Sequence, residues 1–99
     1  MTFVTTHPEF MAAAAGQLTG IGTEVNAHNA AAMVPTTSVT PAAADEVSAL
    51  TAAQFASHAA VYQAVSAHAA AVHELFVSAL GASASSYAAT EAANASSVI

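Results

Sequence analysis

The sequence predicts an all-α fold, an antiparallel two-helix hairpin, and three observations lead to this prediction. Apolar residues recur at helical spacing over two long stretches. A short segment containing prolines separates these stretches, and 30 of the 99 residues are alanine, the strongest helix former. A chain of 99 residues is long enough for one domain, so residues 1–99 are treated as a single domain.

The first helix is expected over about residues 7–33. Thr6 is followed three positions later by Glu9, which is the spacing of a capping box, and Pro8 suits the first turn of a helix. From there, apolar residues recur at alternating steps of three and four along one face. This face comprises Met11, Ala14, Leu18, Ile21, Val25 and Ala32, with His28 in the remaining slot.

A connector and a longer second helix follow. Residues 34–40 contain a proline and β-branched residues, which predict an extended loop. The second helix is expected over about 41–80, with Thr40 as its N-cap and Pro41 in its first turn. Gly81 and the serines after it predict a helix end, so residues 81–99 are expected to form a flexible tail. Because the connector is short, the two helices should pack antiparallel.

The second helix carries two apolar stripes, whereas a helix in a simple hairpin needs only one. The stripe expected to face the first helix comprises Val47, Val61, Val65, Val72, Leu75 and Ala79. The other stripe, expected to be a partner interface, comprises Phe55, Ala59, Tyr62, Ala69, Phe76 and Leu80. The abundance of alanine can exaggerate the width of such stripes, but large residues at seven-residue spacing argue for a genuine surface. We therefore expect the hairpin to complete a four-helix bundle with a partner protein.

The charge composition excludes several functions. The chain has no lysine or arginine, and six acidic residues give it a formal net charge of −6. Nucleic-acid binding and phosphoryl transfer both depend on cationic side chains, so neither is expected. A cationic start typical of a secretory signal peptide is also missing. The longest unbroken apolar run, Phe10–Gly16, has seven residues, far fewer than the roughly 18 of a membrane span, so no transmembrane segment is expected.

Several segments together resemble the N-terminal domain of the mycobacterial PE family, over essentially the whole chain. Phe3–Glu9 is similar to the family's opening, and its Pro8-Glu9 pair is the one that names the family. Pro41–Ser48 and Tyr62–Ala67 are similar to the signatures of the family's second helix. Ser86–Glu91 is similar to its C-terminal secretion motif, in which a tyrosine, here Tyr87, is followed four residues later by an acidic residue, here Glu91.

The resemblance implies a helical hairpin that pairs with a PPE-family protein. It implies export of this heterodimer through a type VII (ESX) secretion system, from the cytoplasm to the cell surface or the medium. It also implies that Tyr87 and Glu91 form the export signal, and that a type VII secretion chaperone binds the complex, largely through the PPE subunit.

No arrangement of residues points to catalysis, to a cofactor or to a metal. His68 and His73 are five residues apart, which is not the spacing of two ligands on one helix face. Asp45 and Glu46 are adjacent, so they point in different directions on a helix. Two alternatives to the secreted heterodimer remain open on the sequence alone. One is a self-assembling homo-oligomeric bundle with a structural surface role, and the other, which fits least, is a histidine-dependent or metal-dependent enzyme.

Overall fold

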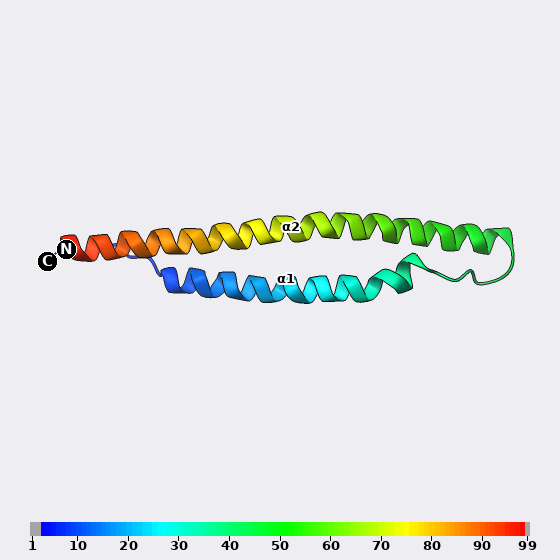
Figure 1. The fold of residues 1–99 in the computed structure, drawn as a ribbon, viewed down its shortest axis with the longest axis horizontal. Coiled ribbons are helices and arrows are strands. Elements are labelled where there is room, and N and C mark those ends of the chain that lie inside the picture. The colour runs from blue at the N-terminus through cyan, green and yellow to red at the C-terminus, as the bar shows by residue number, and fades with distance from the viewer. Residues whose placement is uncertain (1–2, 99) are drawn as a thin grey trace. The chain divides into compact units, whose positions relative to one another are not determined.

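The computed structural model describes residues 3–98 and contains two helices, α1 (Pro8–Thr37) and α2 (Glu46–Ser97), shown in Figure 1. No strand occurs within that range, which confirms the all-α prediction. The chain's contacts divide it into two units. Unit 1 combines Met1–Ile21 with His73–Ile99, and unit 2 is the continuous segment Gly22–Val72. Each helix contributes residues to both units.

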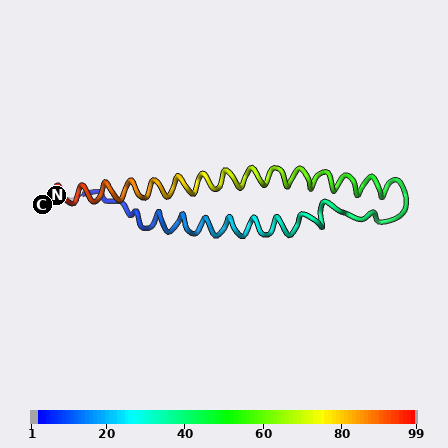
Figure 2. The backbone as a smooth tube through the Cα atoms, in the orientation of Figure 1, coloured from blue at the N-terminus to red at the C-terminus, as the bar shows by residue number. Residues whose placement is uncertain are grey.

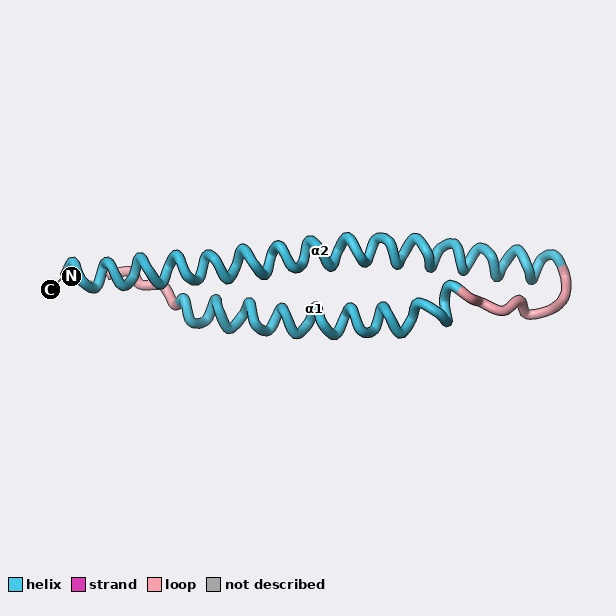
Figure 3. Tube along the Cα trace, in the orientation of Figure 1, coloured by secondary structure: helices cyan, strands magenta, loops and turns pink. Residues whose placement is uncertain are grey.

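Within each unit, the two helices pack antiparallel. In unit 2, residues 38–45 turn the chain from α1 into α2 (Figures 2 and 3), and Asn29 of α1 is hydrogen-bonded to Tyr62 and Gln63 of α2. In unit 1, Leu18 is hydrogen-bonded to His73, whereas the earlier residue Thr6 is bonded to the later residue Glu91. The lower-numbered residue of the N-terminal part thus pairs with the higher-numbered residue of α2. The pairing is therefore antiparallel, and the predicted helical hairpin is confirmed.

Helix α1 starts close to the predicted position but not through the predicted capping box. The N–H of Phe10 donates to the carbonyl of His7 over 3.0 Å, and the Glu9 carboxylate accepts from Nδ1 of His7 over 3.1 Å. The pKa of the Glu9 carboxyl is lowered, first by a hydrogen bond from its own backbone N–H and then by the bond to His7. Thr6 does not bond Glu9, because its hydroxyl is engaged by Glu91.

The end of α1 lies at Thr37, beyond the predicted end near residue 33, so the helix includes Pro35. A proline removes one backbone donor and usually ends a helix. Here the hydroxyl of Thr36 donates to the carbonyl of Ala32, and that of Thr37 donates to the carbonyl of Met33, each over 2.6 Å. These side chains satisfy carbonyls of the last turn, and the loop lies over residues 38–45 rather than 34–40.

Helix α2 begins at Glu46, not at residue 41, because Asp45 is a better N-cap than Thr40. One Asp45 carboxylate oxygen accepts the N–H of Ser48 over 2.8 Å, and the other accepts the Ser48 hydroxyl over 2.9 Å. The first of these bonds satisfies an N–H that has no partner within the helix, and the second adds a side-chain contact in the same turn. They are also the main reason why the pKa of Asp45 is lowered.

The prediction of a flexible tail over residues 81–99 is wrong for the described part, because α2 continues to Ser97. The segment after Gly81 is rich in alanine, which outweighs the helix-weakening effect of its serines. Hydroxyls of Ser85 and Thr90 donate to the carbonyls one turn earlier. Ala84 is buried, so this part of α2 also packs against the rest of unit 1. Residue 99 lies outside the described residues.

The helices meet through small side chains. The buried residues among 3–98 are four alanines: Ala15, Ala52, Ala59 and Ala84. On α2, the side chains facing α1 recur at alternating steps of four and three, and we call this set the alanine seam. It comprises Ala52, Ala56, Ala59, Gln63, Ser66, Ala70, His73, Val77, Leu80 and Ala84, all buried or half-buried. On α1, the corresponding residues include Met11, Ala15, Leu18, Gly22, Asn29 and Ala32.

The predicted packing face of α2 is therefore wrong. The residues expected to face α1, which we call the valine face, are all exposed: Val47, Val61, Val65, Val72, Leu75 and Ala79. On α1, Met11, Leu18 and Ala32 lie in the contact as predicted, whereas Ile21, Val25 and His28 are exposed. Small side chains allow two helix backbones to approach more closely than valine or leucine would, and a seam of alanines exploits this.

Helix α2 is also long and apolar enough to cross a membrane, with a mean hydropathy of 1.2 over an 18-residue window. A single helix of this kind is a weak indication, since the core helices of soluble proteins pass the same test. The absence of a transmembrane segment therefore stays a prediction.

Candidate functional site

Three large aromatic side chains of α2, Phe55, Tyr62 and Phe76, lie outside the alanine seam and are exposed. Residues Phe55, Tyr62, Ala69 and Phe76 recur every seven residues, and we call them the aromatic column. Each lies four residues before a member of the alanine seam, so the column runs beside the seam on the helix surface. No residue of the valine face lies three or four positions from the seam, which places that face on the far side of α2.

In unit 2, the aromatic column is exposed, and its tyrosine is hydrogen-bonded to α1. Phe55 keeps 62% of its surface accessible, and Ala69 is exposed as well. The Tyr62 hydroxyl donates to Oδ1 of Asn29 over 2.7 Å, while Nε2 of Gln63 donates to the Asn29 carbonyl over 2.9 Å. Tyr62 is therefore hydrogen-bonded across to α1, and half of its surface is still open.

In unit 1, the column is represented by Phe76, which is 58% exposed. Two of the six residues predicted for the partner interface lie elsewhere. Ala59, in unit 2, is buried, and Leu80, in unit 1, is half-buried, and both belong to the alanine seam. The structure thus corrects their assignment, because their side chains pack within the chain itself, and the aromatic column retains the other four predicted residues.

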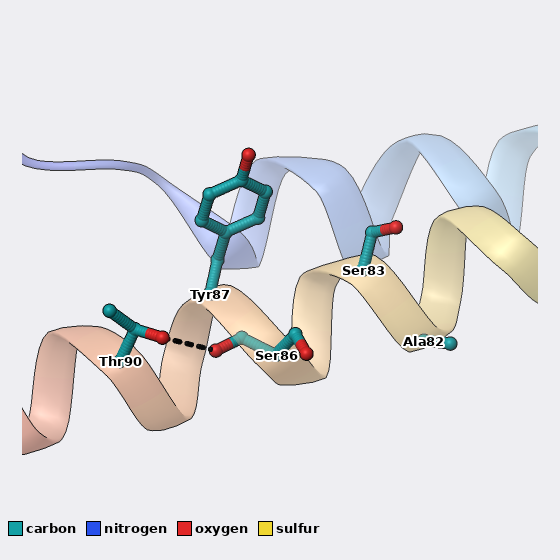
Figure 4. A pocket seen from close by; sticks show the side chains of 5 residues that line it. All are labelled: Ala82, Ser83, Ser86, Tyr87 and Thr90. Atoms are coloured by element: carbon teal, nitrogen blue, oxygen red, sulfur yellow. Dashed lines mark hydrogen bonds between the residues drawn. The ribbon is translucent and has the colours of Figure 1, made fainter.

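Tyr87 and Glu91 lie one turn apart near the end of α2, within unit 1. Tyr87 is 46% exposed and stands out from the helix in Figure 4. Beside it, α2 has a shallow depression of about 410 Å³, lined by Ala82, Ser83, Ser86, Tyr87 and Thr90. A hydrogen bond of 3.0 Å from the Thr90 hydroxyl to the Ser86 carbonyl borders this depression (Figure 4). The region therefore offers an accessible aromatic ring on a hydroxyl-rich helix surface.

Glu91 is half-buried, and its carboxylate is not free. Its Oε1 accepts the backbone N–H of Thr6 over 2.8 Å and the Thr6 hydroxyl over 2.9 Å. The two residues are 85 positions apart. No local sequence signal indicates this contact, and the sequence pattern assigns Thr6 to the cap of α1 instead.

One histidine of α2, His73, bonds to α1. Nε2 of His73 donates to the Leu18 carbonyl over 2.7 Å, and this tautomer is required because a carbonyl can only accept. His28, His58 and His68 are exposed. Within residues 3–98, no three histidine, aspartate or glutamate side chains gather as metal ligands would. That no metal or cofactor is bound remains a prediction.

Comparison with known proteins finds that the chain is similar to one protein family. A family model described as "PE family" matches residues 4–94. The PE family protein PE13 of Mycobacterium tuberculosis is 65% identical over 95 residues, covering 96% of this chain and 96% of that protein. PE family protein PE8 of the same organism is 53% identical over 96 residues, covering 97% of this chain and 35% of that protein. The PE-PGRS family protein PE_PGRS33, also from M. tuberculosis, is 61% identical, and this chain spans only 20% of its length.

Proposed function

The chain belongs to the PE family, and we propose that it is a non-enzymatic helical module that pairs with a PPE-family protein and leaves the cell as a heterodimer through a type VII (ESX) secretion system. Two helices of the partner would pack on the exposed side of this hairpin and complete a four-helix bundle. The aromatic column, with Phe55, Tyr62, Ala69 and Phe76, is the surface assigned to the partner.

One observation supports the proposed pairing with a partner protein: the chain buries alanines and exposes most of its large apolar side chains. Burial of a phenylalanine or leucine side chain is worth about 1.5–3 kcal/mol, and burial of an alanine far less. A hairpin built in this way gains little from folding alone, but it gains strongly when a second protein covers its outer faces. Large apolar patches that remain open in one chain are typical of surfaces meant for a partner.

The export signal in this proposal is the pair Tyr87 and Glu91. Both residues lie on α2 within unit 1, so the helix sets the spacing between Tyr87 and Glu91, unlike in an irregular tail. A type VII secretion chaperone would hold the complex in the cytoplasm through the PPE subunit. The final location would be the cell surface or the medium.

The pairing is tested by expressing the chain alone and together with the PPE-family protein that mass spectrometry finds bound to it in mycobacterial cells. We expect the chain alone to be poorly soluble, and the co-expressed pair to form a soluble 1:1 complex by light scattering. Its interface should exceed about 2,000 Å², as in obligate pairs. If the chain alone forms a monodisperse homo-oligomer that does not bind the PPE-family protein, the homo-oligomeric bundle replaces this proposal. A stable monomer with a sharp thermal transition would also contradict it.

The export signal is tested separately. Tyr87→Ala should abolish appearance of the complex in the culture filtrate while leaving the PPE-family protein bound. Ser85→Ala is the matched control, since Ser85 is an exposed residue of the same helix outside the depression beside Tyr87. Normal export of the Tyr87→Ala complex would show that Tyr87 is not part of the signal.

A further inference from the structure

The contact between Thr6 and Glu91 joins the segment before α1 to the part of α2 that carries the proposed export signal. Thr6 lies in the stretch that precedes α1, whereas Glu91 lies near the end of α2. Both donors of Thr6, its backbone N–H and its hydroxyl, bond the same oxygen, Oε1 of Glu91, at 2.8 and 2.9 Å. Two donors on one carboxylate oxygen form a charge-assisted contact, which is stronger than a bond between neutral groups.

This contact changes the role expected of the glutamate. A carboxylate that merely displayed its charge to a receptor would be exposed and unpartnered. Glu91 is instead half-buried and holds a backbone group of the N-terminal segment. Pro8 begins α1 two residues after Thr6, so no helical hydrogen bond fixes the preceding segment. The contact with Glu91 therefore fixes that segment against α2, one turn from Tyr87.

Two exposed apolar side chains belong to the segment that Glu91 holds. Phe3 and Val4 keep most of their surface open to solvent. When a receptor binds an apolar side chain on a loose segment, the segment must become ordered, and the entropy lost offsets much of the binding free energy. Fixing Thr6 removes part of this cost, so the anchored segment can contribute to recognition.

We propose that Thr6 is a positioning residue of the export signal, and that the surface recognised is composite: the Tyr87 ring together with the N-terminal segment that Glu91 holds in place. This inference rests on the proposed export function. In it, Glu91 acts chiefly as a hydrogen-bond acceptor within the chain, and the receptor site is apolar and aromatic rather than a cationic pocket for the carboxylate.

The experiment uses the complex with its PPE-family partner and measures the fraction exported to the culture filtrate. Thr6→Val removes the hydroxyl but keeps the side-chain shape, whereas Thr6→Ser keeps the hydroxyl. Glu91→Gln keeps an oxygen acceptor without the charge, whereas Glu91→Ala removes the acceptor. Amide hydrogen exchange at residue 6 reports whether the contact is intact, and capture of the PPE-family protein reports pairing.

We expect Thr6→Val and Glu91→Ala to lose export about tenfold, the size of effect that follows from losing a hydrogen bond to a charged group. Thr6→Ser and Glu91→Gln should retain most of it. Exchange of the residue 6 amide should be at least about tenfold faster in Glu91→Ala than in Glu91→Gln, with pairing unchanged in all four variants.

Two results would overturn the inference. One is normal export of Thr6→Val. The other is loss of export in Glu91→Gln while the residue 6 amide stays protected, which would mean that the receptor reads the charge itself. The broader proposal is judged by a different variant, Tyr87→Ala. If Tyr87→Ala is exported normally, the export signal is misassigned altogether. If Tyr87→Ala is not exported while Thr6→Val is exported normally, only the role of Thr6 is removed.

Discussion

The assignment of the aromatic column to the partner predicts a measurable loss of affinity when Phe55 is shortened to alanine. A phenylalanine side chain offers roughly 200 Å² for burial. With 62% of it open in the free chain, about 120 Å² remains for a partner to cover. At about 25 cal/mol per Å², this area corresponds to about 3 kcal/mol. The methyl group that alanine keeps reduces the loss to about 2–3 kcal/mol, or roughly 30-fold to 150-fold in Kd.

Titration calorimetry or surface binding with the purified PPE-family partner gives the affinity of both forms. Ser57→Ala is the matched control: Ser57 is exposed on the same stretch of α2 but lies outside both the aromatic column and the valine face, and its variant should bind like the original. The helical circular dichroism of the two variants should be equal. A Kd for Phe55→Ala within about threefold of the original would refute the reasoning, because an anchor residue at an interface costs more than that. A larger loss for Val61→Ala than for Phe55→Ala would place the partner on the valine face instead.

Three further predictions follow from the packing and the capping. Ala59→Leu should lower the free energy of unfolding of the complex by about 1–3 kcal/mol, because a larger side chain forces the seam apart; Ala60→Leu, at an exposed position, should change it little. If both variants melt at the same temperature, the seam is misplaced. The carboxyl resonance of Asp45 should titrate below the ordinary pKa of 3.8, so its contribution to stability is complete at neutral pH and is lost as the pH falls through this lowered value; a midpoint at or above 3.8 in an NMR titration contradicts the cap. His73→Ala should lower the free energy of unfolding, measured by chemical denaturation, by about 1 kcal/mol, because the bond to α1 is lost. If His68→Ala, at an exposed position, lowers it equally, the bond contributes nothing.

The sequence was sufficient to predict that the chain is helical and that it has more apolar surface than a two-helix hairpin can bury. Helical spacing over both halves of the chain, with Phe55 and Phe76 in register, predicted two helices and a stripe that one hairpin could not cover. The absence of lysine and arginine led us to expect no nucleic-acid binding, because these side chains normally neutralise the phosphates. The resemblance to the PE family depended on the combined order and spacing of Phe3–Glu9, Pro41–Ser48, Tyr62–Ala67 and Ser86–Glu91, and the family match then confirmed it.

The tertiary structure alone decided which face of α2 meets α1, where that helix ends, and what Thr6 binds. In a chain so rich in alanine, several helix faces satisfy a seven-residue apolar repeat, and hydropathy favours the one with valines. The choice is made by how closely two backbones can approach, and alanines such as Ala52 and Ala84 permit the closer contact. The part of α2 beyond Gly81 packs within unit 1 through the buried Ala84, and the bond from Thr6 to Glu91 likewise joins groups from opposite ends of the sequence. Contacts of this kind leave no periodic trace in the sequence, because each depends on the position of another segment.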